Sequence, residues 1–328
     1  MAERESDSYF ATPEQMRRYK IAAVVRTVLT YGFLAVLGLF ILIPFLFMLI
    51  TSFRDPDAYN YDNLHSIFNL IPGAWNEGAQ RANYTLANYV AIFTYKSSTG
   101  RTINFAHYYL NTLYVAIVGV IFTLITTVLA SFAFARCEFK GKNALFTLLL
   151  ATMMIPGEMM VITNFQTVQA FNWQNTFAAL IFVHGVSVFY IFYLRQTFQG
   201  IPNELFLAAK VDGYGHFRYL LKVMIPIGMP TIVTITILSI MGQWNAYIWP
   251  NLVASGDNPI LSQWMGKDWS MLLVSNGLMS LFTNSETGVS QDTVRIAGSV
   301  IVTAPLFVFF LIFRKYIMRG VSRSGIKG

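Results

Sequence analysis

Hydrogen-bonding side chains recur along an apolar stretch of the chain around residue 240. They follow one another at intervals of three or four residues, which places them on one face of a helix: Thr236, Ser239, Gln243 and Tyr247. Trp244, Asn245 and Trp249 lie beside this stripe. Hydroxyl and amide groups next to flat aromatic rings suit contact with a polar, uncharged solute. The alternative interpretation is that the stripe forms hydrogen bonds between packed helices.

One histidine, His184, lies deep within another apolar stretch. A polar side chain at such a depth faces the interior of a helix bundle or a cavity. We interpret His184 first as a structural hydrogen-bonding group for a neighbouring helix, and second as part of the same solute-contacting surface.

Motifs for catalysis are missing from the sequence. The histidines and the single cysteine lie in no arrangement typical of a metal site: His65, His107, His184, His216 and Cys137. There is no GxxxxGK[ST] phosphate-binding loop and no GxSxG nucleophile motif. We therefore expect no enzymatic activity, no metal and no cofactor in this chain.

The composition indicates a protein that lies largely in lipid. Of the 328 residues, 12% are charged and 55% hydrophobic, and the mean hydropathy is +0.50. Soluble domains carry about 25% charged residues. The sequence therefore predicts an all-α integral membrane protein.

Six apolar runs are long enough to cross a bilayer, which takes about 20 residues. They are Thr27–Ile50, Leu110–Ala135, Ala144–Thr163, Thr176–Leu194, Ile225–Ile248 and Ile296–Phe313. Each contains Gly, Ser, Thr or Pro, which favours helices that pack on one another. The fifth run carries the polar stripe, and Trp249 at its end fits an aromatic belt at the membrane surface.

The distribution of positive charge predicts the orientation. Most of the 23 Lys and Arg residues fall on the side of the two termini. The opposite side holds only Arg54, Arg81, Lys96, Arg101, Lys267 and Arg295. The positive-inside rule then places both termini in the cytoplasm. We attribute the net charge of +7 to this orientation and expect no nucleic-acid partner.

The spans divide the chain into segments. Residues 52–107 are rich in aromatic residues, which favours an ordered extracytoplasmic subdomain over a flexible loop. The segments are a cytoplasmic tail at 1–20, a first span at 21–51, the extracytoplasmic segment 52–107, four core spans within 108–253, an extracytoplasmic loop at 254–293, and the last span with a cytoplasmic tail at 294–328.

A polar stretch between the fourth and fifth spans, Gly200–Pro230, has its own pattern. Its apolar residues recur at helical spacing before and after Gly213, which predicts two short helices joined by a corner. Asp212 could cap the second helix or pair with a basic residue of a partner. Two short helices joined by a corner are suited to binding the surface of another protein on the cytoplasmic side of the membrane. The alternative is an amphipathic helix on anionic lipid.

The sequence LAAKVDG in this stretch, with Pro226 following it, resembles the EAA loop of ABC-importer permeases. Ala208, Ala209, Gly213 and Pro226 stand at matching positions, whereas Leu207 replaces the glutamate of the family pattern. The surrounding sequence is similar to that of carbohydrate-type permeases.

This resemblance implies a type I ABC-importer permease fold with a cytoplasmic coupling helix in the 200–226 loop. The coupling residues would be Leu207, Ala208, Ala209, Asp212, Gly213 and Pro226. It further implies a second permease subunit, two ATPase subunits that bind ATP and Mg²⁺, and an extracytoplasmic solute-binding protein contacted by the 254–293 loop. The membrane would be a bacterial plasma membrane and the solute a sugar or oligosaccharide.

Two other kinds of transport stay open. An importer of glycerol 3-phosphate would need basic residues in the pathway, and we find no Lys or Arg within the spans proper. An ion-coupled secondary transporter would typically carry paired carboxylates and repeated broken helices in its spans, and the sequence shows neither.

Overall fold

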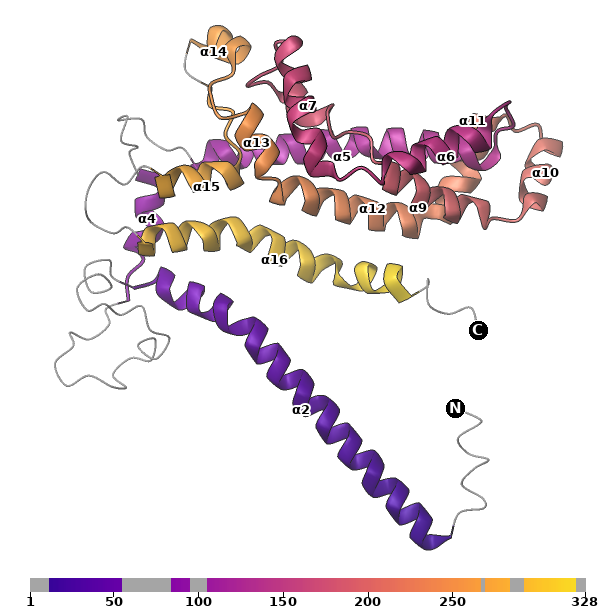
Figure 1. Ribbon diagram of the computed structural model, residues 1–328, viewed down its shortest axis with the longest axis horizontal. Helices are drawn as coiled ribbons and strands as arrows, with labels where there is room; N and C mark the ends of the chain where they lie inside the picture. The colour runs from indigo at the N-terminus through magenta and orange to yellow at the C-terminus, as the bar shows by residue number, and fades with distance from the viewer. Residues whose placement is uncertain (1–11, 55–83, 95–104, 267–268, 284–291, 323–328) are drawn as a thin grey trace. The chain divides into compact units, whose positions relative to one another are not determined.

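The computed structural model describes residues 12–54, 84–94, 105–266, 269–283 and 292–322 (Figure 1). Within these ranges every named secondary-structure element is a helix. The only β pairing in the same ranges is at two isolated bridges, Arg54–Tyr84 and Asp257–Ser270. The all-α prediction is confirmed. Most of the predicted extracytoplasmic subdomain at 52–107 lies outside the described residues.

The chain divides into two units, residues 1–88 with 292–297 and residues 89–291 with 298–328. The first contains helix α2, Pro13–Ser52, which begins at a capping box formed by Thr12 and Gln15. At the other end of α2 the buried Asn88 amide donates to the carbonyls of Ser52 and Arg54, at 2.9 and 2.7 Å. Asn88 also accepts a hydrogen bond from Thr293 at 3.3 Å. These bonds bring three distant segments of the first unit together.

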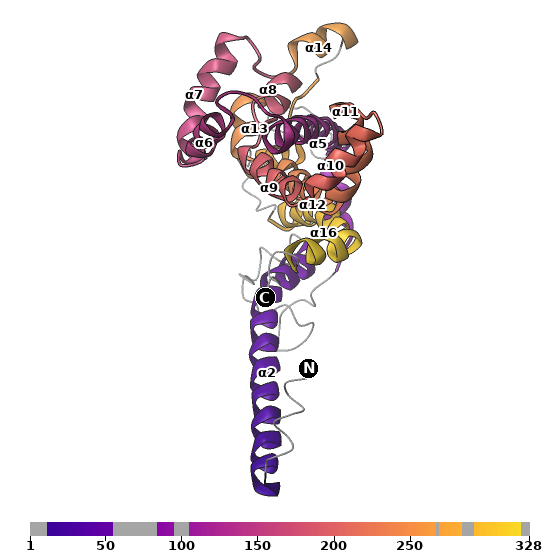
Figure 2. The ribbon, with the colours of Figure 1, turned by 90° about the vertical axis from the view of Figure 1, so that its right-hand side faces the viewer.

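In the second unit, α5 (Phe105–Arg136), α9 (Val188–Gln199) and α12 (Ile225–Asn245) lie side by side (Figures 1 and 2). Thr197 of α9 and Thr231 of α12 share a hydrogen bond of 3.0 Å. A buried cluster fills the space between these helices near their ends, and it comprises Phe132, Leu194, Phe198, Ile201, Ala209, Tyr219, Leu220, Met224 and Ile235. These three helices form the scaffold of the unit.

Two of the predicted spans are broken. The third is the pair α6 (Lys142–Thr152) and α7 (Gly157–Ala170), bent by 97° next to Pro156. The fourth consists of α8 (Phe177–Ile181) and α9, separated by residues 182–187. Four described helices are long and apolar enough to cross a membrane, or five if α6 and α7 count as one span. The predicted number of six stays a prediction.

The short helices of the second unit gather at its two ends (Figure 1). One end carries α10 (Asn203–Val211) and α11 (His216–Tyr219), and a π-helical turn, Leu220–Met224, joins α11 to α12. The opposite end carries α13 (Ile248–Val253), α14 (Pro259–Met265) and α15 (Val274–Thr283).

A proline inside the last helix, α16 (Asp292–Ser322), creates a junction with α5 and α12. Pro305 has no N–H, so the carbonyl of Ile301 lacks its partner within the helix. The Tyr109 hydroxyl of α5 donates to this carbonyl, and the Trp244 indole of α12 donates to Val302 at 3.1 Å. Side chains of two neighbouring helices thus bond to carbonyls of α16 that lie just before Pro305.

Candidate functional site

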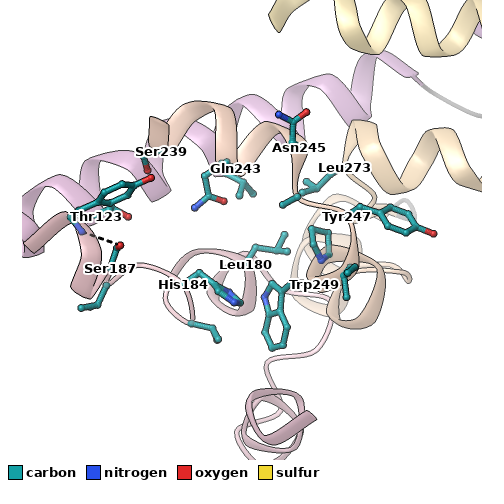
Figure 3. Close-up of a pocket in the computed structure, with 18 residues that line it drawn as sticks. Thr123, Leu180, His184, Ser187, Ser239, Gln243, Asn245, Tyr247, Trp249 and Leu273 are labelled. Atoms are coloured by element: carbon teal, nitrogen blue, oxygen red, sulfur yellow. Dashed lines mark hydrogen bonds between the residues drawn. The ribbon is translucent and has the colours of Figure 1, made fainter. Parts of the chain in front are cut away.

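A cavity of about 750 Å³ lies where α5, the break between α8 and α9, and the end of α12 meet (Figure 3). Among the described residues, no Asp, Glu, Lys or Arg lines it. Its polar and aromatic lining consists of Thr123, His184, Ser187, Tyr190, Ser239, Gln243, Asn245, Tyr247 and Trp249. An uncharged cavity with amide, hydroxyl and aromatic groups can bind a polar solute that carries no charge.

Several of these side chains have unused hydrogen-bonding groups. Within the described part of the chain, the side chains of His184, Gln243, Asn245 and Tyr247 make no hydrogen bond, and all four line the cavity (Figure 3). A Cβ at Gly119 of α5 would lie 3.3 Å from Nε2 of Gln243. The missing side chain at Gly119 therefore leaves room for the Gln243 amide.

The polar stripe predicted from the sequence is only partly brought together. Ser239, Gln243, Asn245 and Tyr247 line the cavity with His184, as the solute-contacting interpretation requires. Thr236 and Trp244 instead line an apolar groove formed with Pro305 and Phe309 of α16. Their polar groups are engaged, because Thr236 donates to Ile232 at 2.8 Å and Trp244 donates to α16. We therefore exclude these two residues from the candidate pathway.

The predicted membrane belt at Trp249 is wrong. Trp249 is only 8% exposed, and its indole donates to the Ala179 carbonyl at 3.0 Å. Its ring meets that of His184 edge-on, with centroids 5.0 Å apart. The chain leaves helix α12 after Asn245 and turns inward, so that Trp249 packs in a buried cluster with Val115, Val253, Met271 and Leu273.

Sequence reasoning missed three polar lining residues, Thr123, Ser187 and Tyr190. Ser187 is the N-cap of α9, where its hydroxyl accepts from the backbone of Tyr190 at 3.4 Å. A serine before an apolar helical run is a recognisable start signal. It could have revealed the break within the fourth apolar run.

At the other end of the unit, the helix and corner predicted around Gly213 are present. Gly213 has a φ of +75°, and its N–H donates to the backbone carbonyl of Lys210 at 3.1 Å. The N–H of Tyr214 donates to the backbone carbonyl of Ala209 at 2.8 Å. This pair of bonds is a Schellman motif, which ends α10. The second predicted helix is not separate, since α11 continues through the π-helical turn into α12, whose first turn contains Pro226.

Ala208 and Ala209, the two alanines that match the EAA loop, have different surroundings. Ala209 is buried in the cluster beneath α10, whereas Ala208 is exposed. Leu207 and Val211 are also exposed, Val211 at 88%. The outer face of α10 thus presents apolar side chains that the described part of the chain does not cover.

The capping role considered for Asp212 is wrong. Asp212 is exposed and forms the C-cap of α10, while Gly215 is the N-cap of α11. The turn of the Schellman motif separates Asp212 from the second helix, so its carboxylate does not reach the first N–H groups of that helix.

The sequence pattern of a known protein family decides the identity. Residues 127–323 match the family described as the inner membrane component of binding-protein-dependent transport systems. The chain belongs to this family. The match includes the Gly200–Pro230 stretch and most of the residues around the cavity.

Relatives of known name are permeases. The arabinooligosaccharides transport system permease protein AraQ of Halalkalibacterium halodurans is 28% identical over 309 residues, which cover 94% of this chain and 99% of AraQ. The permease YcjP of Escherichia coli is 25% identical, over 92% and 98% of the two chains. The diacetylchitobiose uptake system permease NgcG of Streptomyces coelicolor is 24% identical, over 90% and 87%.

A solved structure shares the fold. A chain of a bacterial ABC transporter involved in the import of the acidic polysaccharide alginate superposes with a TM-score of 0.68 at 20% identity, covering 94% of this chain and 99% of that one. The predicted permease fold is confirmed. The chain is a non-enzymatic transport subunit of an ABC importer in the inner membrane.

Proposed function

We propose that this permease imports a neutral sugar or oligosaccharide in an ATP-driven system with a solute-binding protein. The observation that carries the proposal is the uncharged cavity, where side chains of His184, Gln243, Asn245 and Tyr247 have unused hydrogen-bonding groups. Trp249 and Tyr190 supply aromatic faces beside them. Sugars present many hydroxyl groups and apolar C–H faces, which such a lining complements.

The names of the relatives support a sugar as the solute, although the sugars in those names differ in charge. AraQ and NgcG are named for arabinooligosaccharides and diacetylchitobiose, while the structural neighbour imports an acidic polysaccharide. Without a Lys or Arg in its lining, this cavity is a poor site for an anion such as glycerol 3-phosphate. We therefore favour a neutral solute.

We assign α10 and the Gly213 corner to the contact with an ATPase partner. The exposed face of Leu207, Ala208 and Val211 offers an apolar surface, and the Schellman motif gives α10 a defined end. Two ATPase subunits would bind ATP and Mg²⁺, and their closure would shift this element. A second permease subunit would complete the pathway. Both termini and α10 would then be cytoplasmic.

The opposite end of the unit would receive the solute-binding protein. Helix α14 exposes Ile260, Trp264 and Met265. The α14 loop is held in place, since Asn258 caps α14 at Ile260 and Leu261, and Asn111 of α5 donates to Ser270 at 2.8 Å. An exposed aromatic anchor on a fixed support suits a protein partner.

The experiment is uptake of labelled oligosaccharides into cells or vesicles that contain the complete system. We expect Gln243→Ala and Asn245→Ala each to lower uptake about tenfold or more, because each removes hydrogen bonds to solute worth roughly 1.5 kcal/mol. Thr236→Val, on the groove side of α12, should change uptake by less than about twofold. Equal effects of all three substitutions would contradict the assignment of the cavity.

The energy source separates this proposal from an ion-coupled transporter. ATP depletion should stop uptake, and a protonophore applied at constant ATP should leave it unchanged. Uptake that follows the proton gradient at constant ATP would refute the ATP-driven mechanism. Pull-down of the tagged subunit should also recover an ATPase, a second permease and a binding protein.

A further inference from the structure

One arginine joins the end of α9 to the start of α10. Arg136, the last residue of α5, directs one guanidinium nitrogen to the carbonyls of Phe198, at 3.1 Å, and Ile201. Another guanidinium nitrogen lies 3.4 Å from the side-chain oxygen of Asn203, the first residue of α10. A single side chain of α5 therefore contacts both sides of the turn that leads into α10.

The physical reason for this contact lies in the ends of the helices. Carbonyls in the last turn of α9 lack partners within the helix and carry the negative end of its dipole. A guanidinium has five donors in a fixed plane, so Arg136 can bond several of these oxygens at once. Lysine has a single ammonium group and cannot reproduce this arrangement.

A second arginine, Arg195 of α9, makes the reverse contact between the same two helices. Its Nε donates to the carbonyl of Phe134 in α5 at 3.2 Å, and its guanidinium lies 3.9 Å from the centre of the Phe146 ring. Neither of these two side-chain contacts involves the turn at 198–203. Arg195 thus holds α5 and α9 together, while Arg136 additionally holds α10.

We propose that Arg136 is a positioning residue for coupling: it fixes α10 to the inner end of α5, so that a displacement of α10 moves the cavity wall. Thr123, which lines the cavity, lies on α5 about 20 Å from Arg136 at 1.5 Å per residue. Helix α5 is thus a continuous connection between the two sites. This inference rests on the proposed coupling role of α10.

The test compares Arg136→Gln and Arg136→Lys with Arg195→Gln in the complete complex, purified with its partners and reconstituted into vesicles. Solute uptake and ATP hydrolysis are measured together. We expect Arg136→Gln to lower the solute moved per ATP about tenfold, a typical coupling free energy between sites. Arg136→Lys should have an intermediate effect. Arg195→Gln should lower the melting temperature, but the solute moved per ATP should stay within about twofold of that of the unaltered complex.

The single cysteine provides an independent readout. Cys137 follows Arg136 and packs at the edge of the buried cluster beneath α10. If Arg136 holds α10 in place, Arg136→Gln should make Cys137 react several times faster with a thiol reagent. Arg195→Gln should have a smaller effect on this rate.

Two results would overturn the positioning role. One is an unchanged ratio of uptake to hydrolysis in Arg136→Gln, and the other is an equal loss in Arg136→Gln and Arg195→Gln, which indicates only a structural role. If Arg136→Gln fails to assemble, Arg136→Lys takes its place: an unchanged ratio of uptake to hydrolysis in that variant would overturn the positioning role. Absence of ATP-driven uptake by the unaltered complex would instead refute the proposed function.

Discussion

Gly213 is the residue at which a small change should have the largest effect on the end of α10. Its φ of +75° costs any other L-residue about 1–2 kcal/mol. Gly215, two residues later, has a φ of −73°, which any residue can adopt. Neither glycine has an atom within 4 Å of an added Cβ, so the comparison contains no steric clash.

We therefore predict that Gly213→Ala lowers the melting temperature of the purified complex and the rate of ATP-driven uptake. Gly215→Ala changes only the N-cap of α11 and should have a smaller effect on both. Both variants would be compared at equal amounts of assembled complex. If the two alanine variants behave alike, the left-handed corner at Gly213 is not what holds α10 in position.

Single residues differ in how well the sequence predicts their roles. The corner at Gly213 depends on local backbone geometry, which residue type and spacing reveal. The burial of Ala209 and Trp249 depends instead on packing against other elements. Ala209 lies in a cluster that includes residues of α5 and α9, and Trp249 bonds to α8. Their surroundings therefore could not be read from helical periodicity.

At the scale of elements, Pro305 inside α16 gives a quantitative prediction. Tyr109→Phe removes the donor to the Ile301 carbonyl and should cost about 1 kcal/mol of stability, measured as a lower melting temperature. In a Pro305→Ala background, the new N–H at residue 305 can bond Ile301 within α16. The same Tyr109→Phe change should then cost almost nothing.

The double-mutant cycle would therefore show a coupling energy of about 1 kcal/mol between Tyr109 and Pro305. Additive costs would mean that Tyr109 stabilises α16 only by packing. Tyr114→Phe, at an exposed position of the same helix, is a suitable control.

Elements were predicted well where the sequence pattern was continuous. Helices α2, α5, α12 and α16 each fall on a predicted apolar run. The fourth run failed as a single helix because hydropathy measures composition and is blind to a break such as that at residues 182–187. The break places His184 and Ser187 at the cavity, so the missed feature shapes the candidate site.

At the scale of the whole molecule, we predict that Trp264 is an anchor for the solute-binding protein. Trp264 is 86% exposed on α14. Its replacement by alanine should raise the binding-protein concentration needed for half-maximal uptake about tenfold or more, as for other interface tryptophans. Trp264→Tyr keeps an aromatic ring and should be milder. An unchanged concentration dependence in Trp264→Ala would place the binding protein elsewhere.

The partners of the whole assembly could be inferred only from resemblance. Hydropathy and charge predict spans and sidedness, but they hold no information on which protein covers an exposed face. The polar stripe and the residue Asn245 beside it supply four of the five predicted residues that line the cavity. These four, Ser239, Gln243, Asn245 and Tyr247, are close in the chain. The cavity itself required the folding of α5, α8 and α12 against one another.

The break between α8 and α9 also bears on how the chain enters the membrane during synthesis. With 5 and 12 residues, neither half can cross a hydrocarbon layer of about 30 Å by itself. The Gly185 carbonyl between them needs a donor in that layer, and the Thr126 hydroxyl of α5 lies 3.1 Å away. Since α5 precedes the broken segment in the chain, it leaves the ribosome first and can enter the bilayer before that segment. The order of translation thus supplies the partner before the group that requires it.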